Sequence, residues 1–194
     1  MEANLLLEQY GRYKRLALEE SPYHCLLNAD IELNPHQVNA FCAAIQALKT
    51  GGIVLADEVG LGKTIEAGLV LKYVLDSGAK RILIALPATL RKQWEVELDE
   101  KFGLEATILD RLIVEKDYYE TKKWIEDTQE TRIVITSYDY ASKFMKRFPS
   151  VKWDFLIIDE AHNLRNVFHG AKRAKNLYEK SKGIPKILLT ATPL

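Results

Sequence analysis

A glycine-rich segment followed by lysine and threonine is the clearest chemical feature of the sequence. The segment is Asp57-Glu58-Val59-Gly60-Leu61-Gly62-Lys63-Thr64, and a short apolar run precedes it. Glycines let backbone N–H groups approach phosphates, and the start of the following helix adds positive potential. We expect residues 57–64 to bind ATP, with Lys63 on the β- and γ-phosphates and the Thr64 hydroxyl on Mg²⁺. A glycine turn that only caps a helix is the alternative, and Asp57 replaces the glycine that usually opens the pattern.

Two adjacent carboxylates follow a second apolar run. Asp159 and Glu160 end the segment that begins at Trp153, at the expected carboxyl end of a buried strand. We expect Asp159 to contact Mg²⁺ through water and Glu160 to orient and deprotonate the attacking water. Glu160 and Lys63 are therefore the candidate catalytic residues. An acidic helix start is the alternative, but the phosphate loop upstream favours ATP hydrolysis with Mg²⁺ as the cofactor.

The elements that must hold these residues alternate along the chain. Short runs rich in Ile, Val and Leu predict strands at residues 52–56, 81–86, 106–110, 132–136, 155–159 and 186–190. Helical patterns predict helices at residues 35–49, 64–76, 88–101, 115–127, 138–146 and 169–180. Asn34 can cap the first helix, Pro35 suits its first position, and Gln37 is a capping-box partner. This alternation predicts an α/β fold with a mostly parallel sheet flanked by helices.

The composition indicates one globular domain without an overall charge. Of the 194 residues, 47% are hydrophobic, and no apolar run approaches the roughly 20 residues that cross a bilayer. Lys plus Arg equals Asp plus Glu at 27 each, so any nucleic-acid surface must be local. Cys25 and Cys42 lack metal-ligand spacing and are interpreted as reduced packing residues. The N-terminus lacks a secretory signal, which favours the cytoplasm.

The two ends of the chain differ from its middle. Residues 1–32 show no strand rhythm and are expected to form an N-terminal extension packed on a domain of residues 33–194. The chain stops abruptly after a strand, at Pro193-Leu194. We therefore expect the sequence to be a piece of a longer protein.

The ordered motifs resemble superfamily 2 helicase-like ATPases, and within them the Swi/Snf-type translocases of double-stranded DNA. Residues 57–68 look especially like the bacterial branch that includes the RNA polymerase-recycling ATPase, and Asp57 is the residue this family has there. Asp159-Glu160-Ala161-His162 matches its DEAH box. The resemblance implies a RecA-like P-loop NTPase lobe, with a second lobe in cis that supplies transition-state arginines and is absent from this sequence.

The resemblance also implies roles for residues outside the phosphate loop. Gln37 corresponds to the adenine-reading glutamine, although its capping-box role remains open. Motif Ia lies at Ala85 to Leu90, followed by Trp94, which is also expected in the core. The implied nucleic-acid contacts are Pro87, Thr89, Thr136 and Ser137. The implied coupling residues between the nucleotide and nucleic-acid sites are His162, Thr190, Ala191 and Thr192.

The function that follows is an ATP-driven translocase on duplex DNA that remodels or displaces bound proteins, with RNA polymerase a possible partner. A strand-separating helicase of a repair or restriction system is the first alternative. A nucleotide-responsive binding module that never hydrolyses ATP is the second, and Glu160 argues against it. Two basic clusters are candidate DNA contacts or simply solvated faces: Lys172, Arg173, Lys175, Lys180 and Lys182, and Lys143, Lys146 and Arg147. The resemblance places the protein inside the cell, associated with the nucleoid.

Overall fold

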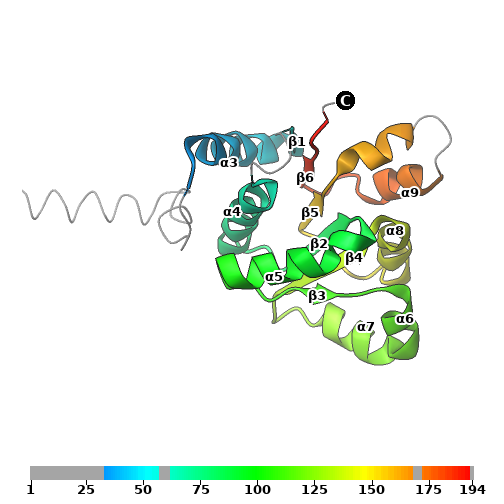
Figure 1. Cartoon of the computed structure of the whole chain (residues 1–194). Coiled ribbons are helices and arrows are strands. Elements are labelled where there is room, and N and C mark those ends of the chain that lie inside the picture. The colour runs from blue at the N-terminus through cyan, green and yellow to red at the C-terminus, as the bar shows by residue number, and fades with distance from the viewer. Residues whose placement is uncertain (1–32, 57–61, 168–171, 193–194) are drawn as a thin grey trace, which may run out of the picture.

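A six-stranded sheet forms the centre of the computed structural model, which describes residues 33–56, 62–167 and 172–192 (Figure 1). The strand order is β1-β6-β5-β2-β4-β3, and all five neighbouring pairs are parallel. The strands are β1 (Gly52–Leu55), β2 (Arg81–Leu86), β3 (Thr107–Ile108), β4 (Arg132–Ser137), β5 (Phe155–Ile158) and β6 (Lys186–Leu189). The α/β class and all six predicted strands are therefore confirmed, although β3 is only two residues long.

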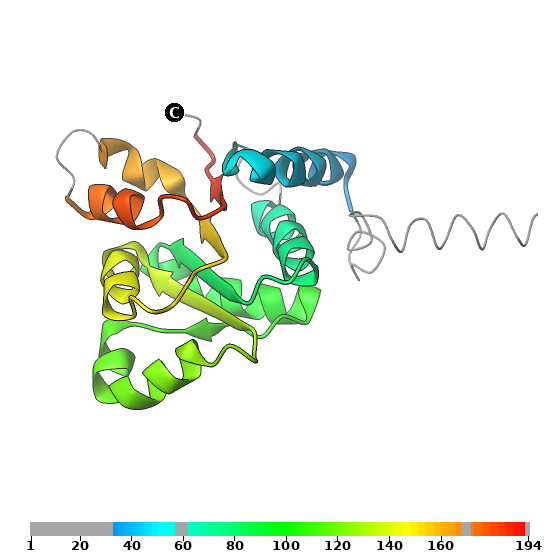
Figure 2. The ribbon, with the colours of Figure 1, turned by 180° about the vertical axis from the view of Figure 1, so that it is seen from behind.

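Helices cover both faces of this sheet (Figures 1 and 2). One face carries α3 (Pro35–Ala47), α4 (Lys63–Asp76) and α5 (Arg91–Phe102), and the other carries α6 (Arg111–Lys116), α7 (Tyr118–Glu126), α8 (Tyr138–Arg147) and α9 (Lys172–Lys180). Within β2, Ile82 and Ile84 join the first core, whereas Leu83 and Ala85 join the second. Because both faces are buried, the strands are almost continuously apolar.

The start of α3 follows the predicted pattern. Pro35 is its first residue, and the Asn34 N–H donates to Gln37 Oε1 over 3.0 Å. The helix ends through a short 3₁₀ turn, η1 (Leu48–Thr50), at Gly51, whose φ of 113° suits glycine. Cys42 is half-buried against the first core, whereas Cys25 and the N-terminal extension lie outside the described residues.

The structure differs from the helical predictions in three places. The predicted helix at 115–127 is two helices, α6 and α7, divided at Asp117. Asp110 begins α6 earlier, because its Oδ1 accepts the Ile113 N–H over 3.1 Å. The helix predicted from residue 88 starts with a 3₁₀ turn, η2 (Ala88–Leu90), and an unpredicted 3₁₀ segment, η3 (Ala161–Val167), follows β5. Of the described helices, none is both long and apolar enough to span a membrane.

Candidate nucleotide site

The carboxyl ends of β1, β6 and β5 bring the predicted chemical segments to one edge of the sheet. These strands are neighbours, and they lead into the phosphate loop, Thr190 and Asp159 respectively. The Thr190 N–H donates to Leu55 O over 3.0 Å, so β6 ends beside the start of the loop. Residues 57–61 of the loop lie outside the described residues. Its described part begins at Gly62, which precedes α4 in a left-handed conformation with a φ of 87°.

The first turn of α4 holds the two functional side chains of the loop that the structure describes. Lys63 and Thr64 are the first residues of α4, and both are half-buried. Burial raises the pKa of Asp159, and the charge of Lys63 lowers it by a smaller amount. This interaction is compatible with a shared phosphate and metal site.

Gln37 packs against the same loop from α3. It is 2% exposed, and a Cβ atom added to Gly62 would lie 2.6 Å from Gln37 Nε2. The amide oxygen is already bound to the Asn34 N–H, so the amide nitrogen is the end that faces the loop. The capping role is confirmed, and the same geometry leaves the predicted adenine contact compatible with it.

Asp159 is a buried carboxylate with both oxygens engaged. The side chain is 6% exposed, Oδ1 accepts the Glu160 N–H over 2.8 Å, and Oδ2 accepts the Trp94 indole N–H over 2.9 Å. Burial raises the pKa of Asp159, whereas these two donors lower it. Trp94 is buried in the first core as expected, but its hydrogen bond to Asp159 was not predicted.

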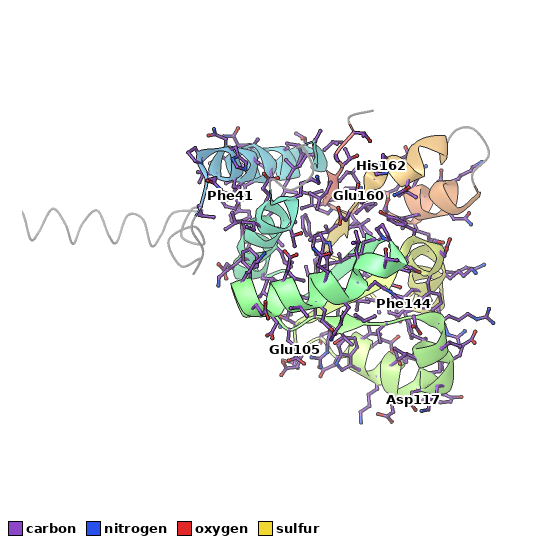
Figure 3. The ribbon with its side chains drawn as sticks, viewed as in Figure 1. Phe41, Glu105, Asp117, Phe144, Glu160 and His162 are labelled. Carbon is purple, nitrogen blue, oxygen red and sulfur yellow. The ribbon has the colours of Figure 1, made fainter. Side chains whose placement is uncertain are left out.

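Glu160 turns the chain out of β5 in a strained conformation. Its φ of 47° is the one positive value among the described non-glycine residues, and such backbone costs about 1–3 kcal/mol. Strain of this kind persists where the surrounding structure fixes it, often at functional sites. Glu160 Oε2 lies 3.1 Å from His162 Nδ1, and the two residues sit together near the end of β6 (Figure 3).

A polar chain continues from His162 to β6. His162 Nδ1 lies 3.3 Å from Thr190 Oγ1, and the Thr190 hydroxyl donates to Thr192 O over 3.0 Å. Because the Thr190 hydroxyl proton is donated to Thr192 O, Thr190 Oγ1 can only accept a hydrogen bond from His162. We therefore assign the imidazole proton to Nδ1. The structure thus brings the predicted coupling residues together, with Ala191 between the two threonines. The coupling itself stays a prediction.

The predicted nucleic-acid contacts lie on adjacent strands but are not equally accessible. Ala85 pairs with Thr136 and Leu86 with Ser137, which places motif Ia beside the second segment. Thr89 is exposed, and Pro87 and Ser137 are half-buried. Thr136 is completely buried, so its hydroxyl is not exposed for the expected phosphate contact, which stays a prediction. The reason is the strand alternation, which points Thr136 to the same face as Val134.

The structure describes the side chains of most residues in the two basic clusters. Lys143, Lys146 and Arg147 are exposed on α8, and Lys175, Lys180 and Lys182 are exposed on or just after α9. Lys182 forms an ion pair of 2.7 Å with Glu179. The side chains of Lys172 and Arg173 lie outside the described residues.

The residues at this edge fit a magnesium ion. Mg²⁺ prefers hard oxygen ligands, which the Thr64 hydroxyl and the Asp159 carboxylate can provide. Each Asp159 oxygen already accepts one hydrogen bond, and the second lone pair of each suits a metal-bound water. Thr64 and Asp159 would therefore hold the ion, the latter through water, and this assignment stays a prediction.

Together, the parallel sheet, the Gly62-Lys63-Thr64 helix start and the strand-end carboxylates define an α/β lobe of the RecA-like P-loop class. A family model described as the SNF2-related domain matches residues 26–194. The chain belongs to that family.

Similar proteins agree with this assignment. The chain is 35% identical to the RNA polymerase-associated protein RapA of Vibrio campbellii, over 98% of the chain and 20% of the relative. It is 36% identical to RapA of Vibrio cholerae serotype O1, over 97% of the chain and 19% of the relative. The SWI2/SNF2 ATPase core of Sulfolobus solfataricus, solved in complex with double-stranded DNA, matches with a TM-score of 0.65 and 26% identity, over 86% of the chain and 33% of that structure. The chain thus spans about a fifth of the length of the curated relatives.

Proposed function

We propose that this chain is the ATP-binding lobe of a DNA-dependent ATPase that moves along duplex DNA and remodels or displaces bound proteins. The observation that carries the proposal is the convergence of Lys63, Asp159 and Glu160 on one edge of the sheet. The name of the RapA relatives and the DNA in the related ATPase core support the choice of DNA, and of RNA polymerase as a possible partner. A DNA partner supports a location in the cytoplasm, at the nucleoid.

The described residues suggest how the chemistry is divided. Lys63 neutralises phosphate charge, and Glu160 orients the attacking water and takes its proton. Bound Mg²⁺ supplies further charge neutralisation on the phosphates. Trp94 holds the Asp159 carboxylate in one orientation, and His162 connects Glu160 to the end of β6. The loop residues 57–62 bind the phosphates, and Gln37 contacts the adenine.

Efficient hydrolysis needs a second lobe. Arginines that stabilise the transition state of phosphoryl transfer are worth about 10³–10⁵ in rate, and the family places them in the second lobe. We expect residues 1–194 alone to bind Mg-ATP weakly, with negligible turnover. A DNA-stimulated rate typical of an intact ATPase, measured on residues 1–194 alone, would contradict this expectation.

The test of the proposed function is ATP hydrolysis by the complete protein with duplex DNA, with single-stranded DNA and without DNA. The Lys63→Ala variant is the control for contaminating ATPases. Stimulation mainly by duplex DNA is the expected result. Stimulation mainly by single strands would favour a strand-separating helicase instead, and ATP binding without hydrolysis would favour a nucleotide-responsive module.

A further inference from the structure

A basic pocket lies between α6 and α8, the helices that follow β3 and β4. Its volume is about 400 Å³, and α6 and α8 lie next to each other in both ribbon views (Figures 1 and 2). The pocket is lined by Arg111, Glu115, Tyr140, Lys143, Lys146 and Arg147. Four cations thus face one carboxylate in a chain whose net charge is zero.

The cations of the pocket are only partly neutralised by neighbours. Arg111 Nε is bound to Glu115 Oε1 over 2.8 Å, and the Arg147 guanidinium lies 4.6 Å from the centre of the Tyr118 ring. Neither Lys143 nor Lys146 forms an ion pair with any described residue. A ring contact leaves the arginine charge in place, so the pocket keeps an excess of positive charge.

Tyr140 adds an unused hydrogen-bond donor to this charge. The residue is 7% exposed, and its hydroxyl has no hydrogen-bond partner among the described residues. An unpaired buried hydroxyl costs about 1–3 kcal/mol. Burial raises the pKa of Tyr140, so the hydroxyl stays protonated at neutral pH. A buried donor beside several cations is the arrangement that an anion with several oxygens would satisfy.

We propose that the pocket between α6 and α8 binds a phosphate group, supplied by a nucleic-acid backbone or by a free phosphate compound. Lys143 and Lys146 provide charge, and Tyr140 donates a hydrogen bond from the base of the pocket. Phosphate is favoured over a carboxylate because it presents more oxygens to a set of cations and a hydroxyl. The nucleic-acid source rests on the proposed function, whereas the chemistry of the pocket does not.

The first test measures binding of a fluorescent duplex to the complete protein over a range of salt concentrations. The variant Lys143→Ala/Lys146→Ala is compared with Lys122→Ala/Lys123→Ala, which removes the same charge from exposed positions of α7. If DNA phosphates fill the pocket, the first variant binds about tenfold more weakly, and its slope of log affinity against log salt falls by about two. The control variant keeps the DNA affinity and the salt slope of the wild-type protein. Equal losses of affinity in the two variants would mean that only the overall charge matters. That result would contradict DNA binding in the pocket.

The second test uses inorganic pyrophosphate and thermal unfolding of the complete protein. It is made in a Lys63→Ala background, so that the nucleotide loop contributes little. If a free phosphate compound fills the pocket, Lys143→Ala/Lys146→Ala abolishes the pyrophosphate-dependent rise in Tm, while Lys122→Ala/Lys123→Ala retains it. Normal DNA binding and an unchanged pyrophosphate effect in the pocket variant would together overturn the proposal. If the wild-type protein does not bind DNA, the proposed function fails and the pyrophosphate result alone decides the pocket.

Tyr140→Phe separates a ligand-binding hydroxyl from a structural one. It removes the donor without changing the charge. We expect binding to weaken about tenfold, whether the phosphate comes from DNA or from pyrophosphate. The Tm without ligand should stay the same or rise, because an unpaired buried hydroxyl is lost. A lower Tm without ligand, with phosphate binding unchanged, would remove Tyr140 from the proposal.

Discussion

The two edges of the sheet use their polar groups in opposite ways. At the amino-terminal edge, charged side chains are bound to the backbone and to each other. At the carboxyl-terminal edge, Asp159 is desolvated and Glu160 is strained. The first edge stabilises the fold, whereas the second holds the residues of the proposed nucleotide site.

The amino-terminal edge is organised around Arg81 and Asp154. The Arg81 guanidinium donates to Ile125 O over 2.8 Å, to Glu130 O over 2.6 Å and to Asp127 O, all at or just beyond the end of α7. Asp154 Oδ2 accepts the backbone N–H groups of Lys80 and Arg81, each over 2.8 Å. A pocket of about 650 Å³ lies here, and its arginine and aspartate are bound to backbone groups of the fold.

The largest effect is expected from Glu160→Gln at the carboxyl-terminal edge. The amide keeps the size of the side chain but cannot take a proton, so the ATPase rate of the complete protein should fall about 10²- to 10⁴-fold. ATP binding and Tm should change little. An undiminished ATPase rate would exclude Glu160 as the general base. The matched change Asp154→Asn should leave the rate intact and lower the Tm.

Arg81→Met at the amino-terminal edge should act on stability instead of activity. The change leaves several carbonyls at the end of α7 without donors, which costs about 2–4 kcal/mol of unfolding free energy. Urea unfolding of the chain measures the loss. Arg111→Met, at an exposed arginine with one partner, should change stability little. Equal effects of the two substitutions would show that the carbonyl contacts of Arg81 do not stabilise the fold.

Trp94→Phe tests whether a buried donor positions the Asp159 carboxylate, which we propose to bind Mg²⁺ through water. Without the indole N–H, Asp159 Oδ2 loses its partner, and the Mg²⁺ concentration for half-maximal ATPase activity should rise about tenfold. The maximal rate at saturating Mg²⁺ should change less. Trp153→Phe is the control, because its buried indole N–H has no partner among the described residues. A general loss of rate in both variants, without a shift in Mg²⁺ dependence, would indicate packing alone.

The sequence predicted what depends on local pattern. Continuous apolar runs located all six strands, and Asn34, Pro35 and Gln37 located the start of α3. The break between α6 and α7 was missed, although Asp110 is a helix-capping residue type and signals the earlier start. The burial of Thr136 could have been inferred from the alternation of β4, since it shares a face with Val134.

Contacts between distant segments could not be predicted in this way. Trp94 and Asp159 are 65 residues apart, and Arg81 and Asp154 are 73 apart. Each pair is set by the neighbours β2 and β5, which the order of strands along the chain does not reveal. Such pairings arise from tertiary packing, for which a single sequence carries no periodic signal.

Lys186 differs from the paired charges around it at the amino-terminal edge, and its substitution is expected to have the smallest effect. It begins β6 at the amino-terminal edge, yet its ammonium forms no ion pair with any described residue, and burial lowers its pKa. Because the folded chain binds this proton less tightly than the unfolded chain, stability due to Lys186 rises as pH increases through the lowered pKa to about 10.5. Lys186→Met should therefore stabilise the chain at neutral pH by less than about 1 kcal/mol, since the group is only partly buried. Urea unfolding at neutral pH and near pH 10.5 measures the difference, which should shrink at the higher pH. A benefit that is equal at both values would attribute the gain to methionine packing, and a loss of stability would mean that Lys186 is paired like Lys80 and Arg81.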